Sequence, residues 1–110
     1  MLQESPLKVL VEVKTSSEGT KSGCAEEDVI ELIGHIRLNC PRLVFDGLMT
    51  IADPRDPEKS FKKMVKLKES VEKSGITVNT MSMGMSGDYE MAIKYGSTQV
   101  RIGSSIFGTR

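Results

Sequence analysis

Apolar residues occur in short runs along the chain, and polar turns separate these runs. Residues 8–13 are rich in Val and Leu with little alternation, which is typical of a strand covered on both faces. Similar runs cover residues 42–52, 77–83 and 99–102. The hydrophobic pattern therefore predicts a strand at each of these positions.

Amphipathic segments lie between the strand-like runs. Apolar residues recur there with the 3.6-residue period of a helix, and charged residues fill many of the other positions. This period predicts helices at about residues 25–39, at residues 58–73 and from Ser86 to Lys94, with a single helical turn at residues 104–107. Because strand and helix alternate regularly, we expect parallel strands joined by right-handed crossovers.

The alternation predicts an α/β fold of about four βα units, which is half of a TIM-like (β/α)8 barrel of roughly 250 residues. A chain of 110 residues is expected to form one domain. Its sheet would end in two unpaired strands, both containing Val, at residues 7–13 and 99–102. Such edges attract further strands, so we expect partners that complete the sheet.

The charge balance narrows the range of partners. Lys and Arg number 15, and Asp and Glu also number 15, so the net charge of zero attracts neither nucleic acid nor an acidic membrane. No apolar run approaches the roughly 20 residues of a membrane helix, and the first residues lack the features of a signal peptide. We expect a cytoplasmic protein, with an organelle as the alternative. Cys24 and Cys40 lack a CxxC motif or a Cys/His cluster, which indicates reduced thiols and no metal site.

Two turns in the last quarter of the chain are candidates for binding a phosphate. Gly103 removes a side chain where the backbone must approach a ligand, and Ser104 places its amide at a helix start. Ser86 follows the strand at residues 77–83 and is expected to cap the next helix, leaving its hydroxyl and the Gly87 amide free for a ligand. Spacing alone leaves an ordinary strand-to-helix turn open in both places, and for Ser86 it favours simple capping.

Charged residues near these turns would affect how well an anion binds there. Arg101 lies inside an otherwise apolar strand, where a guanidinium is costly unless it faces a ligand or forms a salt bridge at the strand's exposed end. Asp88 would repel a dianion, so its carboxylate must point away from a phosphate bound at Ser86. Lys21 either adds positive charge to the same edge or is a solvated loop lysine. Met85 and the methionines before it are interpreted as core side chains.

Four segments, taken in order, resemble the pyridoxal phosphate homeostasis proteins. They are KVLVEVKT at residues 8–15 followed by KSG at 21–23, FDGLMTI at 45–51, SMGMSGD at 82–88 and GSTQVRIGSSIFGTR at 96–110. The resemblance implies an alanine racemase-like barrel that holds pyridoxal 5'-phosphate, with residues 1–110 as its C-terminal half. The expected partner is then a complementary N-terminal half, or another copy of the chain joined through the open sheet edges.

The resemblance also implies roles for single residues. Met85 and Ser86, together with Gly103 and Ser104, would hold the cofactor phosphate, and Arg101 would face the pyridine nitrogen. An arginine there keeps this nitrogen unprotonated and weakens the ring as an electron sink. The family's lysine that binds the cofactor aldehyde has no counterpart among the lysines of this chain. The implied function is non-catalytic cofactor homeostasis; the alternatives are a racemase-like enzyme and a fragment that binds no cofactor.

Overall fold

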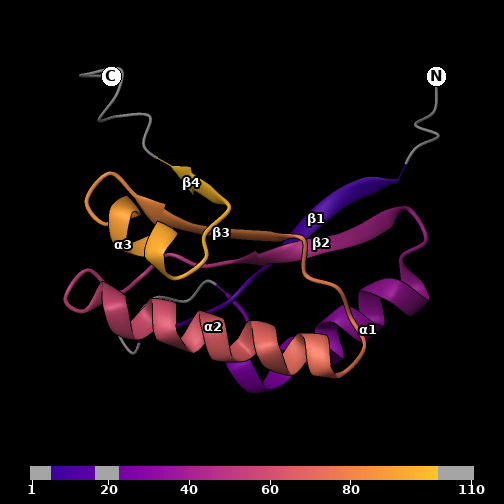
Figure 1. Cartoon of the computed structure of the whole chain (residues 1–110). Coiled ribbons are helices and arrows are strands. Elements are labelled where there is room, and N and C mark those ends of the chain that lie inside the picture. The colour runs from indigo at the N-terminus through magenta and orange to yellow at the C-terminus, as the bar shows by residue number, and fades with distance from the viewer. Residues whose placement is uncertain (1–5, 17–22, 102–110) are drawn as a thin grey trace.

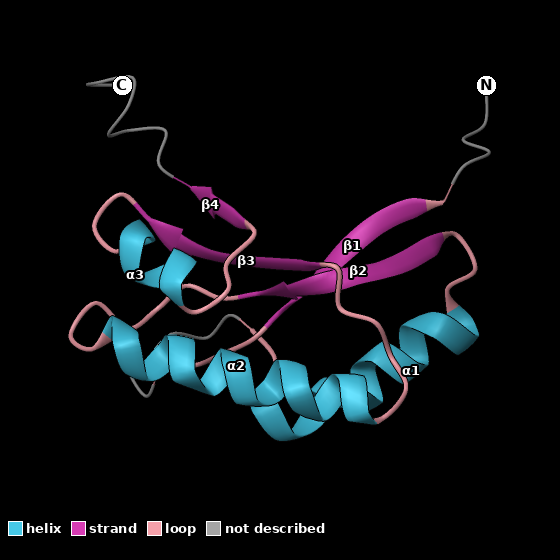
Figure 2. Cartoon of the chain, viewed as in Figure 1, coloured by secondary structure: helices cyan, strands magenta, loops and turns pink. Residues whose placement is uncertain are grey.

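The structure is a computed structural model that describes residues 6–16 and 23–101. It contains a four-stranded parallel sheet in the order β1-β2-β3-β4, with helices packed on one face (Figure 1). The strands are β1 (Leu7–Glu12), β2 (Leu43–Met49), β3 (Thr80–Met85) and β4 (Gln99–Arg101). The helices are α1 (Val29–Asn39), which follows the 3-10 turn η1 (Glu26–Asp28), α2 (Pro57–Lys73) and α3 (Tyr89–Lys94) (Figure 2). The predicted alternation of helices and parallel strands is confirmed.

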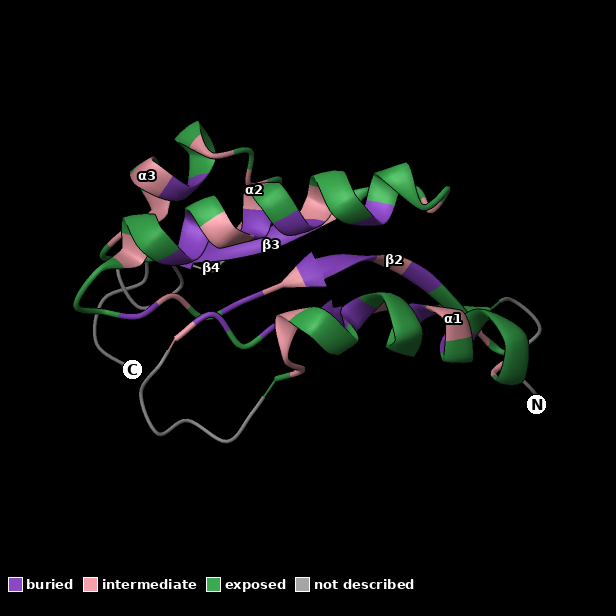
Figure 3. Cartoon of the chain, turned by 90° about the horizontal axis from the view of Figure 1, so that it is seen from below, coloured by how far each residue is buried: buried purple, intermediate pink, exposed green. Residues whose placement is uncertain are grey.

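The core lies between the sheet and the helices. Paired residues of neighbouring strands share a face, and the pairs Val11 with Leu48 and Leu48 with Met81 place three apolar side chains toward the helices. Figure 3 shows buried positions of α2 on its side toward β3. The helices contribute further buried apolar side chains, including Val29, Ile33, Phe61, Met64 and Val71. This layer of apolar contacts holds the strands in register.

The opposite face of the sheet carries the alternate side chains. Glu12 pairs with Met49 and Met49 pairs with Ser82, so these three residues share that face. In a closed barrel the same face lines the interior. Within the described residues no helix covers it (Figure 1), and β1 and β4 each pair with a strand on one side only. Both open edges are those that the sequence predicts.

The third strand begins later than predicted. It starts at Thr80 and not at residue 77. The reason is that β2 has a bulge at Asp46, and Asp46 forms hydrogen bonds with Asn79 and Thr80 in place of regular strand pairing. The Asp46 carbonyl accepts a hydrogen bond from the Asn79 amide at 2.9 Å, and its carboxylate accepts one from the Thr80 hydroxyl at 2.6 Å. Regular pairing of β2 with β3 therefore begins only at Gly47 and Thr80.

Most other helix and strand boundaries lie close to the predicted ones, and the start of the third helix is the exception. The second strand ends at Met49, within the predicted range, and the first helix begins with η1. The third helix begins at Tyr89 and not at Ser86, because residues 85–88 form a tight turn that is described below. The helical turn predicted at residues 104–107 lies outside the described residues.

Gly47 determines how closely β2 and β3 approach each other. A Cβ atom at this position would lie 1.9 Å from the Thr80 carbonyl oxygen, so no other residue fits without separating the strands. Gly34 on α1 offers a contrast, because a Cβ atom there would have no neighbour within 4 Å. The two glycines therefore have opposite consequences for stability.

We predict that Gly47→Ala lowers the free energy of unfolding by about 3 kcal/mol, because the added methyl group overpacks the β2–β3 contact. Gly34→Ala is expected to raise it by up to about 1 kcal/mol, because alanine favours a helix over glycine. Urea denaturation followed by circular dichroism measures both changes. An unchanged stability of Gly47→Ala would contradict the close strand approach.

Candidate functional site

The carboxyl ends of the parallel strands meet at one edge of the sheet. β3 ends at Met85 and β4 reaches Arg101, and these two residues are register partners. The structure thus brings together the backbones of two residues that the family resemblance selects. It does not describe the Arg101 side chain, and Gly103 and Ser104 lie outside the described residues.

The turn at residues 85–88 places Ser86 at this edge. The Asp88 carboxylate accepts a hydrogen bond from the Met85 amide at 2.7 Å, and the Asp88 amide donates to the Met85 carbonyl at 3.1 Å. Ser86 and Gly87, between them, are exposed, and their amides have no acceptor among the described residues. Two free amides and one hydroxyl are suitable donors to an oxyanion.

The turn corrects two sequence-based expectations. Ser86 does not cap the third helix, because the N-cap residue is Asp88, and Asp88 uses its carboxylate for the turn instead of for the helix. Met85 is not a core residue, since it is 44% exposed, whereas Met81 and Met83 are buried as predicted. Both corrections leave Met85 and Ser86 accessible at the sheet edge.

The packing of α3 against β3 depends on Gly84, which directly precedes the turn. Its φ of +106° lies in the region that favours glycine, and a Cβ atom there would lie 2.7 Å from the Cβ of Ala92.

A hollow of about 250 Å³ lies beside the turn and is lined by Pro57 and residues 86–91. The acidic residues Asp88 and Glu90 are among those that line it, so an anion is best placed next to the free amides.

Threonines at the ends of β1 and β2 serve the structure. The Thr15 and Thr50 hydroxyls lie 2.9 Å apart, and the Thr50 hydroxyl donates to the Val13 carbonyl at 2.6 Å. Lys63 of α2 donates to the Thr15 carbonyl at 3.1 Å and lies 3.9 Å from the Glu26 carboxylate. These contacts connect the loop after β1 to α2. The Thr15 and Thr50 hydroxyls therefore already have hydrogen-bond partners within the chain.

Asp53 likewise has a structural role, because its hydrogen bonds to Arg55 hold the loop after β2. Its carboxylate accepts hydrogen bonds from Arg55 Nη2 at 3.0 Å, from Arg55 Nε at 3.2 Å and from the Arg55 amide at 2.9 Å. The Arg55 side chain, then its amide, and to a lesser degree the Ser16 side chain lower the pKa of Asp53 to about 2. No motif or spacing in the sequence indicates this role for Asp53.

Ser82 carries an unpartnered polar group on the barrel-side face. Its Oγ atom is buried and has no hydrogen-bond partner among the described residues. Ser82 pairs with Met49 and with Gln99, so it lies three residues before Met85 on the face that a closed barrel encloses. A buried hydroxyl of this kind requires a water molecule or a ligand group as its partner.

Other binding chemistries find less support in the described part of the chain. Residues 6–16 and 23–101 contain no group of three or more side chains that would suit a metal ion. None of the helices described there has the length and apolar character needed to cross a bilayer. The candidate site is built on the free amides at residues 86 and 87.

Comparison with known proteins points to one family. The model of the alanine racemase N-terminal domain matches residues 2–110. A mouse protein named pyridoxal phosphate homeostasis protein is 45% identical, and the match covers 96% of this chain and 41% of the mouse protein. A protein of the same name from Vibrio alginolyticus is 47% identical, with 96% and 46% covered. The chain thus spans less than half the length of these relatives.

Solved structures show the same fold. An unknown protein from Bifidobacterium adolescentis superposes with a TM-score of 0.77 at 34% identity, covering 89% of this chain and 42% of that one. PipY from Synechococcus elongatus, solved without PLP (pyridoxal 5'-phosphate), gives 0.80 at 25% identity, covering 94% and 50%. PipY with PLP bound gives 0.73 at 22% identity, covering 94% and 50%, and this likeness shows the fold alone.

We predict that Asp53 makes stability depend on pH only in acid. Because its folded-state pKa of about 2 lies below the ordinary 3.8, its contribution is complete above about pH 4 and is lost as the pH falls from 3.8 toward 2. Asp53→Asn should remove this part of the pH dependence and lower stability at neutral pH. Urea midpoints between about pH 2 and pH 7 test this.

The control for this experiment is Glu69→Gln, which removes an exposed carboxylate of α2. It should keep the acid dependence of the unchanged chain. If Asp53→Asn shows the same acid dependence as Glu69→Gln, the Asp53–Arg55 contact does not contribute as described.

Proposed function

The chain belongs to the alanine racemase N-terminal domain family, and on this premise we propose that it binds pyridoxal 5'-phosphate in intracellular homeostasis of the cofactor, without catalysing a reaction. The names of the relatives from mouse and Vibrio alginolyticus support the proposal. The chain forms about half of a TIM-like barrel, and we propose that this is the C-terminal half. The proposal includes a cytoplasmic location.

One observation carries the proposal: the free donors of Ser86 and Gly87 lie at the carboxyl end of β3, next to Arg101 on β4. Phosphate sites of TIM barrels occur at this end of the strands. Backbone amides that are already oriented bind an anion with little reorganisation. The residues present therefore fit the phosphate group of the cofactor.

Each residue has a distinct part in this proposal. Ser86 and Gly87 donate to the phosphate, while Met85, whose amide is held by Asp88, contributes its exposed side chain beside the ligand. Gly103 and Ser104 supply a second set of donors, as the family resemblance implies. Arg101 faces the ring nitrogen and, being always charged, keeps that nitrogen unprotonated.

The proposed lack of catalysis rests on the same residues. When bound, pyridoxal phosphate supplies an aldehyde and a ring that can take up electrons from a substrate. Arg101 opposite the ring nitrogen weakens that electron uptake, and none of Met85, Ser86, Gly103 and Ser104 is a group that removes a substrate proton at neutral pH. These residues are suited to holding the cofactor and not to transforming a substrate.

The proposal also includes partners at the open edges of the sheet. β1 and β4 each leave one side without a strand partner in the described sheet. Strands of a complementary N-terminal half would pair there and cover the face that carries Ser82; another copy of the chain is the alternative. We propose no nucleic acid and no membrane as partners.

We predict that Ser86→Ala weakens pyridoxal phosphate binding about tenfold, because a hydrogen bond to a charged group contributes about 1.5–3 kcal/mol. Arg101→Ala should also weaken binding. Equilibrium dialysis at fixed salt measures both effects. Ser70→Ala on the exposed surface of α2 serves as the control and should leave binding unchanged. Equal binding by Ser86→Ala, Arg101→Ala and the control would overturn the assigned residues.

Two substitutions of Asp88 should change the affinity for pyridoxal phosphate in opposite directions. Asp88→Asn keeps an oxygen that accepts from the Met85 amide but removes a negative charge near the phosphate, so affinity should rise about fivefold. Asp88→Ala opens the turn, so affinity should fall despite the same loss of charge. The same dialysis experiment distinguishes the two effects. Equal affinities of the two variants would show that the turn does not position the donors.

A further inference from the structure

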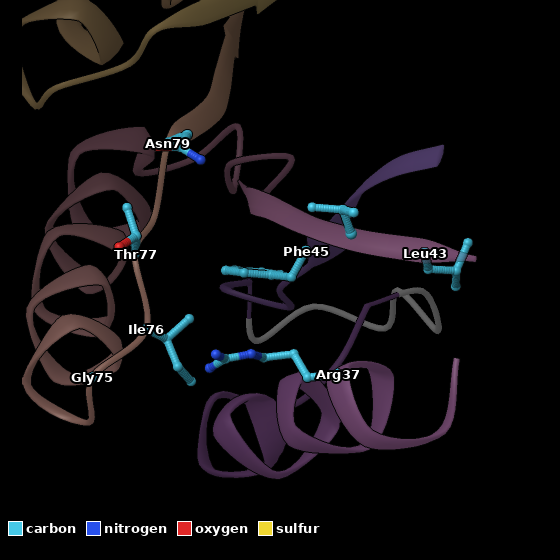
Figure 4. A pocket seen from close by; sticks show the side chains of 8 residues that line it. Arg37, Leu43, Phe45, Gly75, Ile76, Thr77 and Asn79 are labelled. Carbon is cyan, nitrogen blue, oxygen red and sulfur yellow. The ribbon is translucent and has the colours of Figure 1, made fainter. Parts of the chain in front are cut away.

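A second hollow, of about 400 Å³, lies near the amino ends of β2 and β3 (Figure 4). The turn at residues 85–88 lies at the other end of β3. The start of β2, the C-terminal part of α1 and the connection from α2 to β3 form its walls. Its volume falls within the range of about 300–1,000 Å³ that is typical of small-molecule sites. Neither Met85 nor Ser86, the described residues whose side chains are assigned to the cofactor, lines it.

Arg37 supplies the charge in this hollow. Its side chain extends from α1 toward Ile76, on the side of the hollow that faces the Phe45 ring (Figure 4). Among the described residues, Arg37 has no ion-pair or hydrogen-bond partner, and no carboxylate lines the hollow. An arginine is always charged, and its planar fork matches a carboxylate in a bidentate pair. This guanidinium is therefore available to a ligand.

The remaining lining residues define the rest of the ligand. Leu43, Phe45 and Ile76 line the hollow with apolar side chains, of which Phe45 is only 8% exposed. Thr77 is exposed on the same connection as Ile76, and neither its hydroxyl nor its amide is bonded within the described structure. One cation and an apolar surface suit a singly charged anion with an apolar body.

We propose that this hollow is a binding site for a small monocarboxylate with an aromatic or branched aliphatic body. The carboxylate pairs with Arg37, and the body packs against Phe45 and Ile76. A phosphate dianion fits less well, because a single arginine neutralises only half of its charge. The site is independent of the proposed cofactor function, since it lies at the other edge of the sheet and is built by consecutive elements of this chain.

Phenylacetate is the probe for this site, with phenylacetamide as its neutral match. Phenylacetate has about 10 non-hydrogen atoms, so a dissociation constant of about 1–10 mM is expected. Titration followed by amide NMR should shift the signals of Gly75, Ile76 and Thr77. Phenylacetamide should bind at least about tenfold more weakly, because it cannot form the charged pair.

Variants at two exposed positions, Arg37 and Lys66, keep the test separate from folding. Arg37→Gln should weaken phenylacetate binding at least about tenfold, and Arg37→Lys should recover only part of the loss, because lysine lacks the planar fork. Lys66→Gln on α2, which changes charge by the same amount away from the hollow, should bind as the unchanged chain does. Equal binding of phenylacetamide, undiminished binding by Arg37→Gln, or shifts confined to Ser86 and Gly87 would each overturn the proposal.

Discussion

The close pairing of β2 with β3 is the contact on which the rest of the structure depends. Gly47 allows the backbone of β2 to approach Thr80, and from that point Leu48 and Met81 enter the core side by side. The same pairing aligns the carboxyl ends of the strands, so that β3 ends beside β4 at Met85 and Arg101. A shift of one residue would turn every side chain of β3 to the other face and would separate Ser86 from the sheet edge.

At the carboxyl ends of the strands, some polar groups hold the loops in place and others are proposed to bind the phosphate. Thr15, Thr50 and Asp53 have their hydrogen bonds satisfied within the chain, and they hold the loops after β1 and β2 in place. The amides of Ser86 and Gly87 have no such partners in the described structure. Because both residues are exposed, these amides are open to water or to a ligand. The difference between these two sets is the physical basis of the proposed site.

Much of this fold could be predicted from the sequence, because the periods of apolar residues directly reflect which side chains are buried. The boundaries of β3 and α3 could not, since Asp46 and Asp88 set them through hydrogen bonds that compete with regular structure. Ser86 is a candidate for phosphate binding from its position after a strand, whereas Met85 becomes a candidate only through the family motif. The Thr15–Thr50 contact and the hollow at Arg37 join segments far apart in the chain, so no local pattern indicates them.

We propose above all that the amides of Ser86 and Gly87 donate to a phosphate at the carboxyl end of β3. Proton chemical shifts of single amides during titration with pyridoxal phosphate test it most directly. The Ser86 and Gly87 amide protons should move downfield as they form charge-assisted hydrogen bonds. The Met85 amide, already bonded to Asp88, should move less. Unchanged Ser86 and Gly87 signals at saturating cofactor would contradict the claim.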